Sequence, residues 1–181
     1  FLFMFDYRSV FERKNPVGLV RAFKEAFAPG EGPVLVLKSI NEEGHLAERE
    51  RLLYEVAGRP DILLLEGYLG PAEKDALMAA CDAYVSLHRS EGFGLTMAQA
   101  MALGKPTIAT NYSGNLEFMN AENSFLVGFR WGQVPPGCAP YRPGAAWAEP
   151  DLHEAAEVLR RVYLDPEAAR RVGEKAREDI A

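Results

Sequence analysis

The sequence predicts an α/β fold: a doubly wound, Rossmann-like, mostly parallel sheet of about six strands with helices on both faces. Two observations carry this prediction. Apolar runs of four to seven residues alternate along the chain with segments of helical periodicity. Most of these runs are apolar at nearly every position, as in strands that are buried on both faces of a parallel sheet. Strands and helices that alternate in this way form right-handed βαβ units.

Six segments are expected to form the strands. They are rich in β-branched, aromatic or leucine side chains, which favour extended structure. The segments are Leu2–Asp6, Val34–Ile40, Ile62–Leu65, Ala83–His88, Pro106–Thr110 and Phe125–Phe129.

Helices are expected between these strands, the last of them short. Asn15-Pro16 is a start signal, because Asn caps helices and Pro has the φ of a first helical turn. Gly58 and Gly104 follow the last periodic residue of two helices and are expected to end them. The helices are Pro16–Phe27, His45–Ala57, Pro71–Cys81, Thr96–Leu103 and a short one near Asn115–Met119.

The last third of the chain changes character. Residues 130–150 hold five prolines and three glycines, and no helix or strand pattern fits them. We expect a Pro/Gly-rich loop there, either a functional lid or a mobile segment, because long loops in compact domains usually have such a role. The remaining residues predict two helices, the second beginning at Asp165-Pro166.

Length and composition predict one domain over residues 1–181. The chain opens on FLFMFD, a strand already in progress, and stops within a helical pattern, so we expect a fragment of a longer protein. The net charge of −6 argues against a nucleic-acid binder. No apolar run approaches the roughly 20 residues of a membrane span, so no span is expected here, and peripheral membrane association of the full protein stays open.

Two cysteines, Cys81 and Cys138, are too few for a disulfide framework and favour a reducing, cytoplasmic setting. No spacing of His, Cys and Asp suggests a metal site. A nicotinamide-binding domain is a poor fit, since no G-x-G-x-x-G motif follows an expected strand.

The turn from Arg89 to Leu95 carries the clearest chemistry. It lies at the carboxyl end of an expected strand, where doubly wound sheets bind ligands. Gly92 and Gly94 let the backbone approach a ligand closely. The unpaired amides of Leu95, Thr96 and the next residue open a helix and, with its dipole, form an anion site suited to a diphosphate.

Glu91 sharpens this prediction. A carboxylate among the amides would repel phosphates, so Glu91 is expected to face hydroxyl groups beside them, which indicates a sugar. A surface acid favoured by the helix dipole is the alternative.

The stretch EGFGLTMAQAMALGKPTIAT resembles the donor-site signature of the retaining glycosyltransferases of group 1, which have the GT-B-type architecture. A looser resemblance extends over ERKNPVGLVRAF, LEGYLGPAEKDALMAACDAYVSLHRSEGFG and YSGNLEFMNAENSFLV. It implies the C-terminal half of such an enzyme, which binds the nucleotide sugar, with the acceptor-binding N-terminal domain missing.

The resemblance also implies roles for residues of the turn. Glu91 matches the Glu that holds the donor sugar's hydroxyls, and the backbone of Phe93, Gly94 and Leu95 matches the cradle for sugar and phosphate. The second Glu of the family, which binds the ribose hydroxyls, is Gln99 here. An amide accepts one hydrogen bond and donates another, so ribose binding is expected in altered form.

Basic residues are expected to supply the rest of the mechanism, since fixed cations stabilise the charge that develops on a departing diphosphate. Lys14 stands at the position of the family's catalytic Lys. Arg8 and Arg13 are candidates for its Arg, although Tyr7-Arg8 replaces the family's usual Gly-Arg pair. The alternative is three solvated charges in a polar loop.

Weaker candidates complete the predicted site. Lys38 ends a strand and faces either the nucleotide or solvent, while Tyr68 and Leu69 stand where the family packs its base. Residues 112–115 are interpreted as a capping turn in preference to a site rim, and His88 as a loop histidine.

The sequence therefore predicts the donor half of a glycosyltransferase that uses a nucleoside-diphosphate sugar of the UDP or GDP type and needs no cofactor. A non-catalytic nucleotide-sugar-binding or interaction module with a degenerate site is the alternative, because of Gln99 and the segment 130–150.

Overall fold

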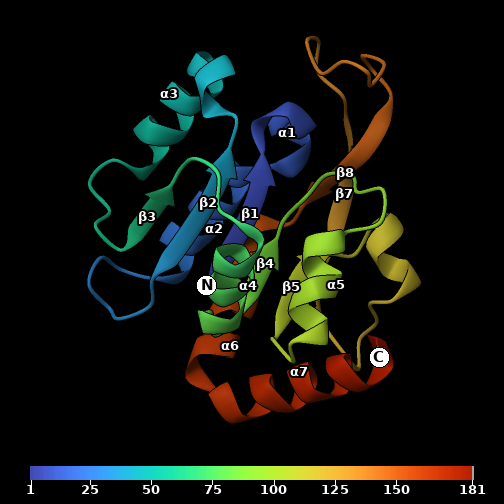
Figure 1. Cartoon of the computed structure of the whole chain (residues 1–181). Coiled ribbons are helices and arrows are strands. Elements are labelled where there is room, and N and C mark those ends of the chain that lie inside the picture. The colour runs from blue at the N-terminus through green and yellow to red at the C-terminus, as the bar shows by residue number, and fades with distance from the viewer. Residues whose placement is uncertain (181) are drawn as a thin grey trace.

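The computed structural model describes residues 1–180 and contains a six-stranded sheet of order β3-β2-β1-β4-β5-β6 (Figure 1). All neighbouring strands in it are parallel. This confirms the predicted doubly wound α/β architecture. The strands are β1 (Leu2–Asp6), β2 (Leu35–Ile40), β3 (Ile62–Leu65), β4 (Tyr84–Ser86), β5 (Thr107–Thr110) and β6 (Phe125–Val127).

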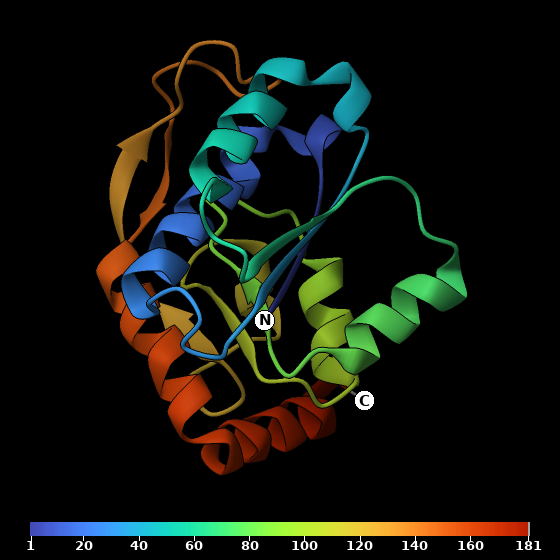
Figure 2. The ribbon, with the colours of Figure 1, turned by 90° about the vertical axis from the view of Figure 1, so that its left-hand side faces the viewer.

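Helices cover both faces of this sheet (Figure 2). One face carries α2 (Pro16–Ala26), α3 (Leu46–Val56) and α6 (Leu152–Leu164), and the other carries α4 (Pro71–Ala80) and α5 (Leu95–Ala102). The last helix, α7 (Pro166–Ile180), runs across the amino ends of the strands and packs against α5 and α6. The central strands are therefore enclosed on both faces, which explains their nearly continuous apolar sequences, whereas the edge strand β3 leaves Leu63 and Leu65 exposed.

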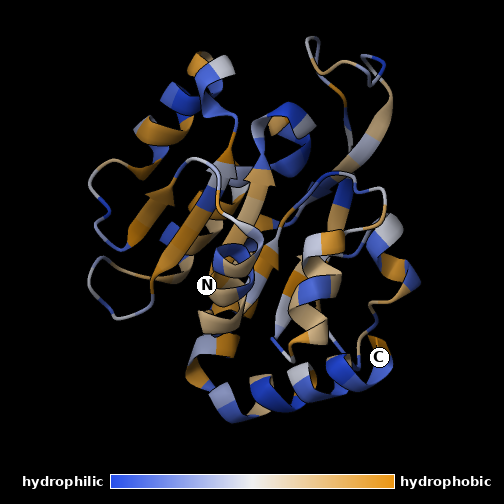
Figure 3. Cartoon of the chain, viewed as in Figure 1, coloured by the Kyte–Doolittle hydropathy of each residue, from blue (hydrophilic) through white to orange (hydrophobic). Residues whose placement is uncertain are grey.

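The core follows from this layering. Figure 3 shows largely hydrophobic strands at the centre and a largely hydrophilic α7 at the edge. Phe3, Tyr84, Val85 and Ile108 from three neighbouring strands are almost completely buried. Burying such side chains contributes roughly 1.5–3 kcal/mol each, so the centre of the sheet is a rigid base for the loops at its carboxyl edge.

The predicted helix boundaries agree with the structure to within about two residues, and three further short helices appear. Gly58 (φ 75°) and Gly104 (φ 70°) lie just beyond two helices in the left-handed conformation. The expected helix near Asn115–Met119 is a 3₁₀ turn, η3 (Gly114–Glu117). The additional elements are η1 (Tyr7–Ser9), α1 (Phe11–Lys14) and η2 (Glu42–Gly44).

The prediction of a structureless loop over residues 130–150 is wrong. This segment forms most of an antiparallel hairpin between β7 (Phe129–Gln133) and β8 (Ala146–Pro150), a second sheet of its own. Both views show its connecting loop beyond the carboxyl edge of the main sheet (Figures 1 and 2). The prolines and glycines of that connection obscure the strand pattern in the residues on either side of it. Within the hairpin, Gly132 pairs with Trp147 and lies close to its indole ring.

Candidate functional site

Two loops meet at the carboxyl edge of the sheet, where the strand order reverses. The loop after β1 carries Arg13 and Lys14, and the loop after β4 carries Glu91. β1 and β4 are neighbours in the sheet, although their loops lie almost 80 residues apart in the chain. Doubly wound folds bind ligands in the crevice at such a switch point.

A short helical turn presents the two cations. α1 begins after Val10, whose φ of 64° is strained for a β-branched residue. The amides of Arg13 and Lys14 donate back to the Val10 carbonyl at 3.0 and 3.2 Å. Asn15 ends the turn in the left-handed conformation and caps α2 by accepting from the Gly18 amide at 3.2 Å. Its Nδ2 donates to the Leu87 carbonyl, which ties the turn to the end of β4.

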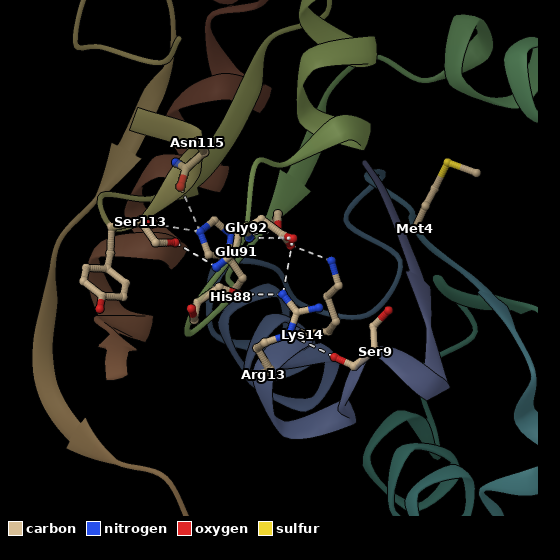
Figure 4. A network of polar contacts seen from close by, with 12 residues as sticks. Met4, Ser9, Arg13, Lys14, His88, Glu91, Gly92, Ser113 and Asn115 are labelled. Atoms are coloured by element: carbon tan, nitrogen blue, oxygen red, sulfur yellow. Dashed lines mark hydrogen bonds and ion pairs between the residues drawn. The ribbon is translucent and has the colours of Figure 1, made fainter. Parts of the chain in front are cut away.

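Both cations pair with Glu91 (Figure 4). Lys14 Nζ lies 2.5 Å from Oε2 and Arg13 Nη1 lies 3.2 Å from Oε1, and the Glu91 side chain is only 13% exposed. Arg13 also donates to the carbonyls of Ser9 and Ser90. Burial raises the pKa of the Glu91 carboxyl, but the charges of Lys14 and Arg13 outweigh it and lower this pKa overall. The Glu91 carboxyl is therefore ionised at neutral pH, where it faces two basic side chains.

A third loop holds Glu91 from the other side. The Glu91 amide donates to Ser113 Oγ at 2.7 Å, and the Gly114 amide donates to the Glu91 carbonyl at 3.1 Å. Gly114 has to be glycine, because a Cβ there would overlap the carbonyl of Gly92. The prediction of a plain capping turn at 112–115 thus missed its contact with the site.

His88 lies in the loop just beyond β4, as interpreted, but its side chain is not solvated. The ring is fully buried at the end of β4, with Nδ1 3.0 Å from Ser86 Oγ. Nε2 lies 3.1 Å from both the Tyr112 carbonyl and Asn115 Oδ1, so these acceptors require a proton on Nε2. Burial lowers the His88 pKa and keeps the ring neutral. It joins β4 to the loop that supports Glu91.

The amides before and at the start of α5 (Leu95–Ala102) are unpaired, as the sequence predicts. Gly94 has a φ of 95° and opens α5, and Ala98 is the first residue of that helix to bond back to it. Among residues 1–180, the amides from Phe93 to Met97 have no hydrogen-bond acceptor. Phe93 and Leu95 are 50% and 70% exposed, whereas Gly94 and Met97 are buried, so only part of this run lies at the surface of the protein. Five unpaired amides with a helix dipole can hold an anion.

The remaining predicted residues are dispersed around this centre. Gln99 is exposed on α5 and accepts from Lys74 at 3.5 Å. Arg8 is exposed, and its guanidinium has no hydrogen bond or ion pair within the described part of the chain. Tyr68 is exposed and Leu69 half-buried on the loop after β3.

Lys38 differs from its expectation. The side chain is buried, and burial lowers the pKa of its ammonium group. Nζ donates to the carbonyls of Ser39 and Gly67. The Lys38 ammonium thus binds two backbone carbonyls and links the end of β2 to the loop after β3.

A hollow of about 930 Å³ lies at the opposite, amino edge of the strands, beside Phe1, Val34 and Pro106. Within residues 1–180, no three His, Cys, Asp or Glu side chains are grouped to hold a metal, and no helix is long and apolar enough to cross a membrane.

Two characterised proteins that this chain resembles are both trehalose synthases. The chain is 27% identical to a trehalose synthase of Pyrococcus horikoshii over 72% of its length and 25% identical to one of Rubrobacter xylanophilus over 96%. It spans only 27% and 34% of those two proteins. The structure of Anabaena Alr3699/HepE in complex with UDP matches with a TM-score of 0.68 and 19% identity, over 99% of this chain and 43% of that one.

The structural likeness confirms the expected fold, a Rossmann-like unit of the GT-B type. The sequence profile of the family described as glycosyl transferases group 1 matches residues 3–179, nearly the whole chain. This chain therefore belongs to the group 1 glycosyl transferases.

Proposed function

We propose that this chain is the donor-binding half of a retaining glycosyltransferase, which moves a sugar from a nucleoside diphosphate to an acceptor. The observation that carries the proposal is the cluster of Arg13, Lys14 and Glu91 beside the free amides from Phe93 to Met97. This arrangement combines an anion cradle, two fixed cations and one carboxylate at a single edge of the sheet. A sugar linked to a diphosphate uses all three.

In the proposed mechanism, the amides of the cradle and the dipole of α5 bind the diphosphate. Negative charge grows on the departing diphosphate as its bond to the sugar breaks. Arg13 and Lys14 are held in place before the donor arrives, so they stabilise that charge without reorganisation. The Glu91 carboxylate holds both cations and accepts hydrogen bonds from the sugar's hydroxyl groups.

Other residues complete the proposed donor site. Gln99 faces the ribose, Tyr68 and Leu69 contact the base, and Thr96 adds its hydroxyl near the phosphates. Arg8 has a free guanidinium and is a further candidate for the diphosphate. The Anabaena relative was crystallised with UDP, which supports a UDP-type donor; GDP and ADP are tested beside it.

The acceptor is proposed to bind between this chain and a second, N-terminal domain of the whole protein, in the cytoplasm. The chain spans about a third or less of its curated relatives, which supports this division. We expect the 181-residue chain to bind a nucleotide without transferring sugar.

Thermal unfolding with UDP, GDP or ADP tests the proposal. A ligand at a concentration of 100 times its Kd stabilises the folded chain by about 2.7 kcal/mol, which raises Tm by roughly 5–11 °C in a chain of this size. Lys14→Ala is expected to lose most of this shift. Lys24→Ala is the matched control, because Lys24 pairs with Glu55 far from the site. No shift with any nucleotide would instead favour the interaction module.

A further inference from the structure

The β7–β8 hairpin is fastened to the candidate site through Arg89. Its guanidinium forks onto the Glu149 carboxylate of β8, with Nε–Oε2 and Nη2–Oε1 distances of 2.7 Å. It also lies 5.3 Å from the centre of the Trp147 ring. The Ala148 amide donates to the Arg89 carbonyl at 3.0 Å, so β8 binds both the backbone and the side chain of Arg89.

The same Arg89 reaches the turn that carries the two cations. Its Nη1 donates to the Glu12 carbonyl at 2.5 Å, and its amide donates to the Arg13 carbonyl at 2.8 Å. One residue therefore binds two successive carbonyls of α1 and also the hairpin.

The hairpin supports the start of α1 as well. Val134, Cys138 and Trp147 form a small apolar cluster that packs against Val10. The turn is thus held at its strained first residue and at its far end. These contacts connect α1 to the hairpin, directly through Val10 and indirectly through Arg89.

α1 needs such support for a physical reason. It has only four residues, far below the length at which a helix is stable alone. A strained residue like Val10 persists only where its surroundings fix it. The planar guanidinium of Arg89 provides this through a bidentate pair that a lysine cannot reproduce.

We propose that Arg89, held by Glu149, is a positioning residue that keeps α1 in register, so that Arg13 and Lys14 stay against Glu91. The part of this inference that concerns phosphate rests on the proposed function. The hairpin is then a buttress of the donor site, although none of its residues belongs to the anion cradle.

The chain contains a close structural match for use as a control. Arg59 also forks onto a carboxylate, that of Asp61, at 2.8 and 2.6 Å. It also donates to a backbone carbonyl, that of Phe27, and lies 5.6 Å from the Phe23 ring. It precedes β3 and therefore lies at the opposite, amino edge of the sheet. A purely structural role for Arg89 predicts that the two arginines behave alike.

The test compares Arg89→Lys with Arg59→Lys in UDP and UMP binding by calorimetry, with GDP or ADP and its monophosphate if that diphosphate stabilises the chain. Arg89→Lys should weaken UDP binding by about tenfold and UMP binding by less than about threefold, because UMP lacks the distal phosphate. Arg59→Lys should change both affinities by less than about twofold at a similar loss of Tm. Equal effects of the two variants would overturn the inference.

A carboxyl titration decides the positioning without any nucleotide. The groups that face Glu91 are Lys14, Arg13 and the buried His88. If Arg89→Lys releases the turn, the Glu91 pKa, followed by the carboxyl ¹³C shift, rises toward its usual range, while Arg59→Lys leaves it unchanged. An unchanged pKa in Arg89→Lys would overturn the inference.

The two proposals fail separately. If the unsubstituted chain bound no nucleotide, the proposed function would fall, and the titration would still show whether Arg89 positions the cations. If Arg89→Lys does not fold, Glu149→Gln against Asp61→Asn gives the same comparison from the carboxylate side of each pair.

Discussion

Gly114→Ala should disturb the candidate site by a displacement that the structure defines. A Cβ on Gly114 would lie 2.5 Å from the Gly92 carbonyl carbon and 3.0 Å from the Glu91 carbonyl oxygen. The Gly92 carbonyl oxygen would lie closer still, and ordinary contacts begin at about 3.4 Å, so the two loops have to separate by more than about 1 Å. Gly114 has no positive φ, so alanine itself is unstrained there and the cost is steric. Overpacking of this kind typically costs about 1–3 kcal/mol.

The expected loss of Tm is about 2–12 °C, since 1 kcal/mol corresponds to about 2–4 °C in a chain of this size. Calorimetry should also show at least about tenfold weaker UDP binding, because misplacing site groups by 1 Å is costly. Gly44→Ala is the control: it adds the same methyl group with nothing within 4 Å and no positive φ. A Gly114→Ala chain as stable as Gly44→Ala, with the same UDP affinity, would refute this reasoning.

Three further predictions concern single residues. Lys14→Ala in the full-length enzyme should lower kcat by about a hundredfold or more, and a loss under about threefold would end its proposed catalytic role. Gln99→Glu should change nucleotide affinity at least about threefold by calorimetry, because it restores a carboxylate near the ribose; an equal affinity would remove Gln99 from the site. The pKa of buried His88 is lowered, so the unfolded chain takes up its proton first and stability falls as the pH drops below 6.5. Urea unfolding at about pH 7.5 and 5.5 should show this loss of unfolding free energy, and the loss should be smaller in His88→Gln. The exposed His153, whose pKa is raised, acts in the opposite direction, but it does so equally in both proteins.

The sheet and its helices were predictable because their signals are local. A strand covered on both faces is apolar throughout, and Asn15, Gly58 and Gly104 mark helix ends by their own conformational preferences. The turn around Glu91 was visible for the same reason, since its glycines and the following helix are contiguous in the chain. The antiparallel hairpin was missed because pairing depends on two segments that are separated by a proline-rich connection.

The amino-acid sequence by itself determined the fold class, the order of the strands along the chain and the position of the turn whose backbone amides are unpaired. Only the tertiary structure decided that Arg13 and Lys14 meet Glu91, that His88 is buried and neutral, and that Arg89 joins the hairpin to α1. These contacts join loops that are far apart in the chain. Their partners are chosen by strand order and packing, which no local pattern of residues encodes.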